Sequence, residues 1–295
     1  MPEQYEEKTV HYYSQQSAIT DPGTYAYIFE DLPQDLPGLM QVVQGVLIFP
    51  FAGWAKHYGI QVSEERSAEL NLRTVARMLE GILALDPAPL SVPRPPQKRL
   101  YGLCRDFAVL LVAMLRHQGL PARERVGFGG YFNSEWYWDH RITEYWDGSR
   151  QRWVLVDPRL DGVQREVLQR KVDPLHITRE SPFLVAGEVW QRCRMGQADP
   201  ETFVDSPTDR GMPIIRYALL HDFDALNKAE LSGTDSWHEL ISKPEEAVTE
   251  EERKLLDEIA ERTVRVDTQF QELQALYAAT PYGQAVQRQL AIQVR

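Results

Sequence analysis

Three residues in the middle of the chain have the types that cooperate in nucleophilic acyl transfer: Cys104, His140 and Asp157. A cysteine thiolate attacks a carbonyl carbon, a histidine accepts the thiol proton and later protonates the leaving group, and a carboxylate holds the imidazole in one tautomer. These roles predict an enzyme that acts on amide or thioester carbonyls through an acyl-thioenzyme. The residues leave open whether water or an amine then takes the acyl group.

The first element that must position this chemistry is a helix beginning at Cys104. Apolar residues recur after it at helical spacing, Gly119 suits the position just beyond the helix, and Pro121 prevents continuation. A thiol at a helix N-terminus faces the positive end of the helix dipole and unpaired N–H groups, which favour thiolate over thiol. The segment 101–123 is therefore expected to present Cys104 as a nucleophile.

The other two residues are expected on a β-hairpin. Strands are predicted over 124–128, 131–132, 140–146 and 152–156. Gly129-Gly130 indicates a turn or bulge, Asp147-Gly148 indicates a hairpin, and Asp157-Pro158 ends the last strand. His140 and Asp157 then fall on neighbouring antiparallel strands, against which the cysteine helix can pack.

Further candidates surround these three residues. The Cys104 backbone N–H is the natural first donor to an oxyanion, and Gln97 or Tyr101 could supply a second. Trp136 and Trp138 could wall a substrate cleft or belong to the core. Glu144 could contact substrate or form a structural salt bridge, for instance with Arg123. Arg105 and Asp106 are expected to be structural, since an acidic residue suits the first turn of a helix.

The flanking sequence is expected to be mainly helical. Helices are predicted over 39–49, 63–85, 183–195, 214–231 and from a capping box at Thr249 and Glu252 towards Tyr277, whose charged residues are expected to face solvent. The segment 86–96, rich in proline, is expected to be an extended connector. The predicted class is α+β, with a helical N-terminal region 1–96, a catalytic core 97–165 and a helical extension 166–295.

Composition excludes several function classes. A formal net charge of −11 argues against nucleic acid as the main partner. Two cysteines in 295 residues suit a reducing compartment, and Cys193 is expected to be structural. The N-terminal residues do not have the pattern of a signal peptide, and the apolar run 39–55 is too interrupted to span a bilayer, so a cytoplasmic protein is expected.

The expected partners are peptide, protein or small-molecule amide and thioester substrates. No cofactor is expected, because a zinc site built from Cys104, His140 and Asp157 would lack a fourth ligand. The oligomeric state is left open.

The motifs together resemble the bacterial transglutaminase-like superfamily. The matching text is Gly102-Leu103-Cys104-Arg105-Asp106-Phe107-Ala108, the stretch from Leu115 to Arg123, His140-Arg141-Ile142-Thr143-Glu144 and Trp153-Val154-Leu155-Val156-Asp157-Pro158. The resemblance covers roughly residues 97–160 and implies a papain-like fold with Cys104, His140 and Asp157 as the catalytic triad. Ile142 stands where an aromatic residue is common. The superfamily includes peptidases, amidases and amide-forming acyltransferases, and the alternative is a binding module that keeps the fold without catalysis.

Overall fold

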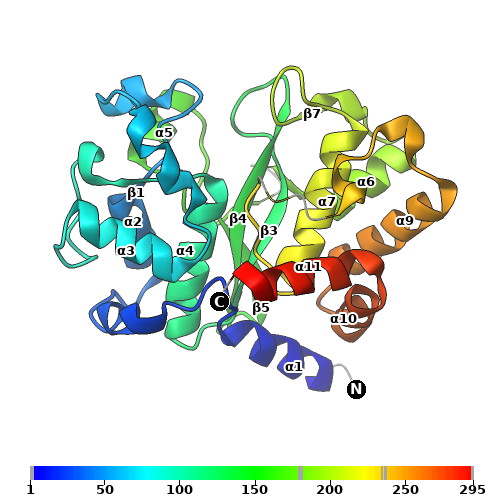
Figure 1. Ribbon diagram of the computed structural model, residues 1–295, viewed down its shortest axis with the longest axis horizontal. Coiled ribbons are helices and arrows are strands. Elements are labelled where there is room, and N and C mark those ends of the chain that lie inside the picture. The colour runs from blue at the N-terminus through cyan, green and yellow to red at the C-terminus, as the bar shows by residue number, and fades with distance from the viewer. Residues whose placement is uncertain (1–2, 179–181, 234, 236–237, 294–295) are drawn as a thin grey trace. The chain divides into compact units, whose positions relative to one another are not determined.

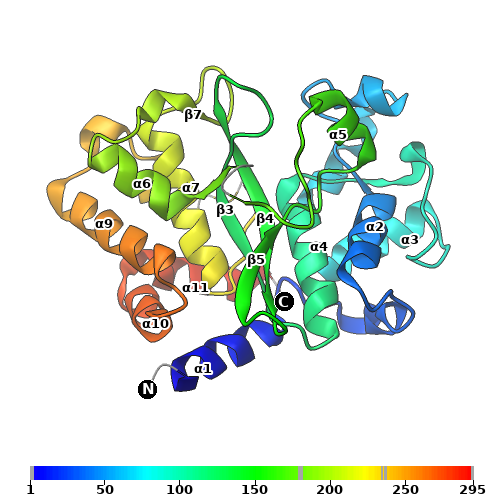
Figure 2. The ribbon, with the colours of Figure 1, turned by 180° about the vertical axis from the view of Figure 1, so that it is seen from behind.

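The computed structural model describes residues 3–178, 182–233, 235 and 238–293. The chain forms two compact units: unit 1 comprises Met1–Tyr12, Glu124–Arg141 and Thr178–Arg295, and unit 2 comprises Tyr13–Arg123 and Ile142–Ile177. Figures 1 and 2 show the elements from opposite sides. The domains expected at 1–96, 97–165 and 166–295 stay a prediction, because a compact unit need not coincide with a domain that folds by itself.

The buried helix of unit 2 is the predicted cysteine helix. It is α4, Cys104–His117, and every residue from Arg105 to Arg116 is buried. Gly119 follows with φ +76°, the left-handed conformation expected beyond a helix end. Helices α2 (Leu36–Val46) and α3 (Val75–Leu85) pack against α4. The predicted start and end of this helix are confirmed.

Two predicted helices of unit 2 have bounds that differ from those expected. The chain leaves α2 at Val46 and forms strand β1 (Leu47–Ile48), which pairs in parallel with β2 (Leu100–Tyr101). The prediction of one helix over 63–85 is wrong, because a 3₁₀ helix, Glu64–Asn71, precedes α3. The Ser63 side chain makes no capping bond, whereas the Thr74 hydroxyl accepts the Arg77 N–H at 3.3 Å. The Glu69 carboxylate accepts the Tyr101 N–H at 2.8 Å, which ties the 3₁₀ helix to β2.

The sheet is the second part of the predicted core. In the described residues its strand order is β5-β4-β3-β6, with β7 also paired to β4. The strands are β3 (Ala122–Gly129), β4 (Tyr137–Asp147), β5 (Arg152–Val156), β6 (Phe183–Val185) and β7 (Phe203–Val204). The β4–β5 pair is antiparallel, as predicted. With helices beside a largely antiparallel sheet, the fold class is α+β, which confirms the prediction.

The strand predictions need one correction. The short strand expected at 131–132 is absent, and these residues lie in a turn after β3. The predicted hairpin is confirmed: Asp147 pairs with Arg152, so four residues connect the strands, and Gln151 among them is left-handed (φ +50°). The Asp147 carboxylate accepts the N–H groups of Ser149 and Arg150, which stabilises this loop.

Helices α6 (Ala186–Arg194), α7 (Met212–Leu226) and α9 (Glu250–Val264) pack together in unit 1. The helix expected over 183–195 begins only at Ala186, because the three preceding residues pair with β3 as β6. The Thr249–Glu252 capping box is confirmed. The helix after it does not continue to Tyr277: it ends at Val264, and α10 (Phe270–Ala279) follows after a turn that buries Val266. The remaining α-helices described are α1 (Glu3–Ser14), α5 (Gly162–Leu168), α8 (Glu239–Ser242) and α11 (Pro281–Gln293).

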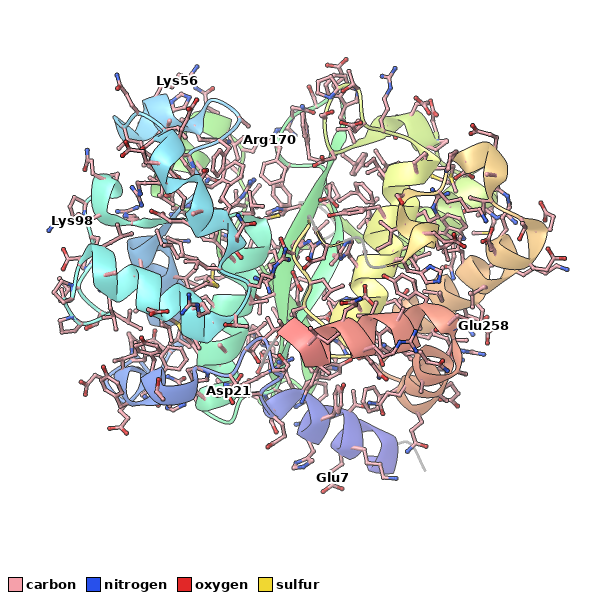
Figure 3. All side chains as sticks on the ribbon, in the orientation of Figure 1. Glu7, Asp21, Lys56, Lys98, Arg170 and Glu258 are labelled. Carbon is pink, nitrogen blue, oxygen red and sulfur yellow. The ribbon has the colours of Figure 1, made fainter. Side chains whose placement is uncertain are left out.

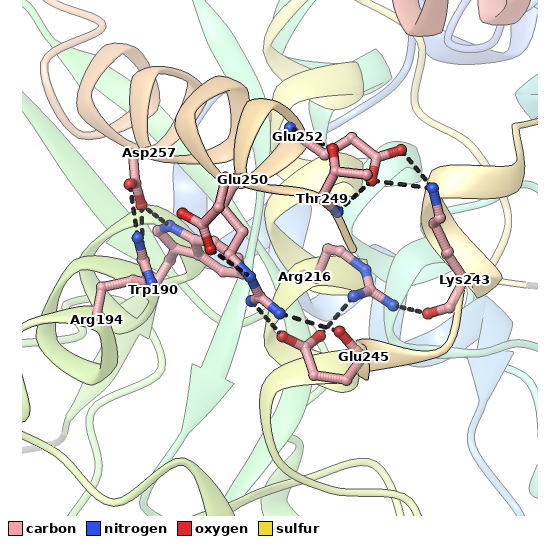
Figure 4. Close-up of polar contacts among 10 residues, drawn as sticks. Trp190, Arg194, Arg216, Lys243, Glu245, Thr249, Glu250, Glu252 and Asp257 are labelled. Atoms are coloured by element: carbon pink, nitrogen blue, oxygen red, sulfur yellow. Dashed lines mark hydrogen bonds and ion pairs between the residues drawn. The ribbon is translucent and has the colours of Figure 1, made fainter. Parts of the chain in front are cut away.

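The charged face of α9 is only partly solvated, which corrects the expectation. Figure 4 shows Glu252 bound to Lys243, Nζ–Oε1 2.7 Å, and Asp257 bound to both Trp190 and Arg194. Buried Arg216 of α7 pairs with Glu245 at 2.6 Å. Glu245 also pairs with Arg253 of α9 at 2.5 Å, so these contacts join α6 and α7 to α9. Other charged side chains, such as Lys56 and Lys98 of unit 2, extend away from the ribbon (Figure 3).

None of the helices in the described part of the chain has both the length and the apolar character needed to cross a bilayer.

A buried carboxyl group makes the stability of unit 1 sensitive to pH. The two oxygens of Asp224 accept the hydroxyls of Tyr277 (2.9 Å) and Tyr282 (2.6 Å). Burial raises the Asp224 pKa to about 8, against the opposing effect of these bonds and of Arg141. The folded state thus keeps a proton on Asp224 that the unfolded chain releases. The stability that this proton contributes, about a few kcal/mol, is lost as the pH rises from about 4 to about 8.

Asp224→Asn is expected to flatten this pH dependence, because asparagine keeps the size of the side chain without the ionisable proton. Thermal melting of both proteins at pH 5, 7 and 9 measures the effect. Equal losses of melting temperature in both proteins would contradict the assignment.

Candidate active site

Cys104 is the first residue of α4 and is half-buried, at the start of a helix whose next twelve residues are buried. Its amide is among the N–H groups that an α-helix does not use internally. Both the helix dipole and these N–H groups favour a negative charge at this position. The structure therefore presents the thiol where a thiolate is stabilised.

The residues after Cys104 anchor the start of α4. The Asp106 carboxylate accepts the Leu103 N–H at 2.8 Å and pairs with Arg105 at 3.0 Å. Buried Arg105 also donates to the Arg73 carbonyl, at 2.6 Å, just before α3. These contacts confirm that Arg105 and Asp106 are structural, and they hold the backbone that carries the thiol.

Asp157 lies immediately after strand β5 and is completely buried. Its Oδ1 accepts the Arg159 N–H at 3.0 Å, and its own N–H donates to the Pro174 carbonyl at 2.8 Å. In the same unit, the Thr143 hydroxyl of β4 donates to the Ala108 carbonyl of α4 at 3.1 Å. The cysteine helix thus packs on the β4–β5 hairpin, as predicted.

His140 lies on β4 within unit 1, and its side chain is buried. The ring edge packs against Phe132 (5.0 Å between centroids), Tyr131 (6.1 Å) and Phe183 (6.4 Å). These aromatic neighbours restrict the orientation of the imidazole. The sequence analysis missed this enclosure, since Phe183 reaches His140 only through the pairing of β6 with β3.

Cys104 and Asp157 belong to unit 2 and His140 to unit 1. Strand β4 runs through both units, from His140 through Arg141 to Ile142. The joint action of the three residues stays a prediction and is taken up below.

The candidates for a second oxyanion donor have distinct surroundings. Tyr101 is buried, its ring lies under the Arg66 guanidinium, and its hydroxyl contacts the Ser63 N–H (3.3 Å) and the Gln61 carbonyl (3.4 Å). Gln97 is exposed on a 3₁₀ turn, and its carbonyl accepts from Arg66. An oxyanion role for either residue stays a prediction.

The candidates for substrate contact also have different surroundings. The salt bridge predicted between Glu144 and Arg123 is present, Nε–Oε2 2.7 Å, with the arginine side chain fully buried. Trp136 and Trp138 are half-buried and pack against each other at 5.9 Å. Among the described residues, the buried Trp138 indole N–H has no hydrogen-bond partner. A substrate role for these three residues stays a prediction.

Asp139, beside His140, is a titratable group that sequence reasoning missed. Burial raises the pKa of its carboxyl to about 7; Arg141 lowers this pKa and Asp205 raises it. The parallel register of β4 with β7 explains the proximity, because Trp138 pairs with Val204 and Asp205 follows. A titration near neutral pH in this protein can therefore come from Asp139 as well as from a histidine.

Cys193 differs from Cys104 in its position on a helix. It lies in the last turn of α6, where the dipole disfavours a negative charge. Burial, together with the charge of Asp199, raises the Cys193 pKa to about 11. This environment agrees with the prediction that Cys193 is structural.

A search of the described residues finds no cluster of three or more histidine, cysteine, aspartate or glutamate side chains suited to a metal ion.

The fold and the position of the thiol define an α+β domain in which a cysteine begins the helix that packs on an antiparallel hairpin. Residues 69–158 match the model of the transglutaminase-like superfamily, so this part of the chain is a transglutaminase-like domain. The match confirms the predicted resemblance and begins before the predicted segment, so that it includes α3. The superfamily is generally associated with cysteine-based catalysis. Comparisons with curated proteins and with solved structures found no match.

Proposed function

We propose that the protein is a cysteine-dependent acyl-transfer enzyme whose catalytic triad is Cys104, His140 and Asp157. The observation that carries the proposal is the half-buried thiol at the start of an otherwise buried helix, inside the segment that matches the transglutaminase-like superfamily. A binding module would need no thiol at this position. The buried acid after β5 and the histidine enclosed by aromatic rings support the other two roles.

The proposed reaction has two steps. The Cys104 thiolate attacks the carbonyl carbon of an amide or thioester, and the Cys104 N–H donates to the developing oxyanion. Protonated His140 gives its proton to the leaving amine or thiol as the tetrahedral intermediate collapses to the acyl-thioenzyme. Neutral His140 then accepts a proton from water or an amine, which attacks the thioester and releases the thiolate. Asp157 stabilises the imidazolium in both steps.

A substrate library searched by intact-mass spectrometry tests this proposal. An acyl adduct is expected on Cys104, and His140→Ala is expected to slow its formation by about 10²–10⁴-fold, the usual contribution of a general acid–base group. Near-UV circular dichroism checks that the variant keeps its fold. Adding a primary amine then separates the two reactions: a transferase yields the amide, and a hydrolase yields only the acid.

The rival proposal is a binding module without catalysis. If His140→Ala forms adducts at the rate of the unmodified protein, His140 is not the base. If Cys104 forms no adduct with any donor while ligands bind reversibly, the binding module is the better description.

A further inference from the structure

The short parallel pair β1–β2 places the segment after β1 beside the residues that lead into the cysteine helix. The Gly102 N–H, one residue after β2, donates to the Ile48 carbonyl at the end of β1, at 3.0 Å. Paired parallel strands end at the same edge of a sheet, which is where ligands bind in many α/β folds. The segment after β1 and the segment leading to Cys104 therefore begin side by side.

The segment after β1 carries aromatic rings, and one of them contacts Tyr101, shortly before Cys104. Phe49 packs edge-on against Phe51 at 5.6 Å, and Phe51 against Tyr101 at 6.2 Å. Phe51 and Trp54 pack on the buried cluster of Ile48, Tyr58 and Tyr101. Phe49, Phe51 and Trp54 are themselves only half-buried. We call these three residues the aromatic wall.

The residues that follow Asp157 also contact the aromatic wall and the buried cluster beneath it. The Arg159 guanidinium lies over the Phe49 ring at 4.5 Å, and the Arg159 N–H is the donor to Asp157. Asp161 accepts the Tyr58 hydroxyl at 2.8 Å, and Val163 packs on the cluster beneath the wall. In Figures 1 and 2, the segment after β1 and α5 lie side by side within unit 2. The wall thus contacts Tyr101, shortly before the proposed nucleophile, and Arg159, shortly after the proposed acid.

The backbone at the tip of this segment is constrained. Ala52 has φ +50° and Gly53 has φ +83°, between Phe51 and Trp54. A left-handed alanine is strained, and such residues are concentrated at binding and active sites. The Phe51 carbonyl accepts the Trp54 N–H at 2.9 Å, which closes the turn between the two residues.

We propose that the aromatic wall binds the side chain of the acyl donor and selects donors with an aromatic or large apolar group. The inference deepens the proposed function and rests on Cys104 as the nucleophile. Half-exposed rings gain free energy by covering apolar surface and by edge contacts with another ring, whereas a polar side chain gains neither. The wall is contributed by residues before the segment that matches the superfamily.

A pair of alkylating probes tests the selection. N-(2-phenylethyl)chloroacetamide and N-(2-hydroxyethyl)chloroacetamide react alike: the Cys104 thiolate displaces chloride and forms a thioether. Their second-order labelling rates, measured by intact mass, are each divided by the rate with glutathione. The unsubstituted protein is expected to prefer the phenylethyl probe. Phe51→Ala and Trp54→Ala are each expected to lower the preference about tenfold, through lost apolar area and ring contacts.

Two further variants sharpen the test. Phe51→Leu keeps an apolar side chain in the cluster and is expected to lose only the ring contact, about two- to tenfold of the preference. Tyr27→Ala removes an exposed aromatic ring elsewhere in unit 2 and is expected to keep the preference unchanged.

The outcomes separate the two proposals. If iodoacetamide itself labels Cys104 no faster than an ordinary thiol, the proposed function fails. If iodoacetamide labels Cys104 fast but the normalised probe preference is absent, the aromatic wall is overturned. A preference that survives in Phe51→Ala, Phe51→Leu and Trp54→Ala overturns it as well.

Discussion

Iodoacetamide at pH 6 is expected to label Cys104 about 100-fold faster than Cys193. The two thiols lie at opposite ends of their helices, Cys104 at the first residue of α4 and Cys193 in the last turn of α6. Thiols at helix N-termini commonly ionise at or below neutral pH. With a pKa of about 11, Cys193 has about one thiolate in 10⁵ molecules at pH 6.

The expected ratio is smaller than the ratio of thiolate fractions, because a less basic thiolate is also a weaker nucleophile. Labelling followed by peptide mapping at pH 5, 6, 7, 8 and 9 measures both sites in one sample. The rate at Cys193 is expected to rise tenfold per pH unit, and the rate at Cys104 is expected to level off.

Cysteine-to-serine variants serve as matched controls. Cys193→Ser is expected to keep the fast phase, and Cys104→Ser is expected to remove it. Equal and slow labelling of both thiols would favour the non-catalytic binding module.

Replacing Glu144 by glutamine is expected to destabilise the protein by about 3–5 kcal/mol, because a buried arginine would lose its counter-charge. Arg123 is fully buried, pairs with Glu144, and lies over the rings of Trp153 (3.9 Å) and Tyr13 (5.0 Å). Urea unfolding followed by tryptophan fluorescence measures the loss.

A double variant distinguishes lost pairing from lost packing. Arg123→Met with Glu144→Leu removes both charges and keeps apolar volume on the two rings, so most of the stability is expected to return. Far below the unfolding midpoint, Glu144→Gln is expected to leave alkylation of Cys104 by iodoacetamide unchanged if Glu144 is only structural. A stable Glu144→Gln protein with impaired adduct formation would instead assign Glu144 to the substrate.

The elements that the sequence predicts well are those determined by local signals. The α4 boundaries follow from residues within a few positions of each end, Cys104 at the start and Gly119 beyond the end. The hairpin follows from the alternation of polar and apolar residues in β4 and β5. The salt bridge from Glu144 to Arg123 was one of two open alternatives, and its complementary charges lie on adjacent strands.

The errors arise where contacts distant in sequence override local preference. Glu69 accepts the backbone N–H of Tyr101, which ties the 3₁₀ helix to β2, whereas the local periodicity predicted one continuous helix through this segment. Residues Phe183–Val185 fit a helical pattern, but pairing with β3 makes them a strand. Similarly, the chain turns between Val264 and Phe270 and buries Val266 there, which separates α9 from α10.

In the candidate site, too, some features follow from local motifs and others from contacts distant in sequence. The types and order of Cys104, His140 and Asp157 can be seen in the sequence, because each belongs to a short motif. The rings around His140, the raised pKa of Asp139 and the cation above Phe49 depend on strand pairing and on segments outside the motifs. The motifs alone contain no information about residues that the fold brings close from distant parts of the sequence.

The interleaving of the two units in the sequence has a consequence for biosynthesis. Unit 2 is complete once Ile177 has left the ribosome, whereas unit 1 also requires the residues from Thr178 onward. During that interval β3 lacks β6, and β4 lacks β7. Unpaired strand edges on a nascent chain invite aggregation. The nascent chain is therefore most exposed to aggregation while residues 178–204 are being synthesised.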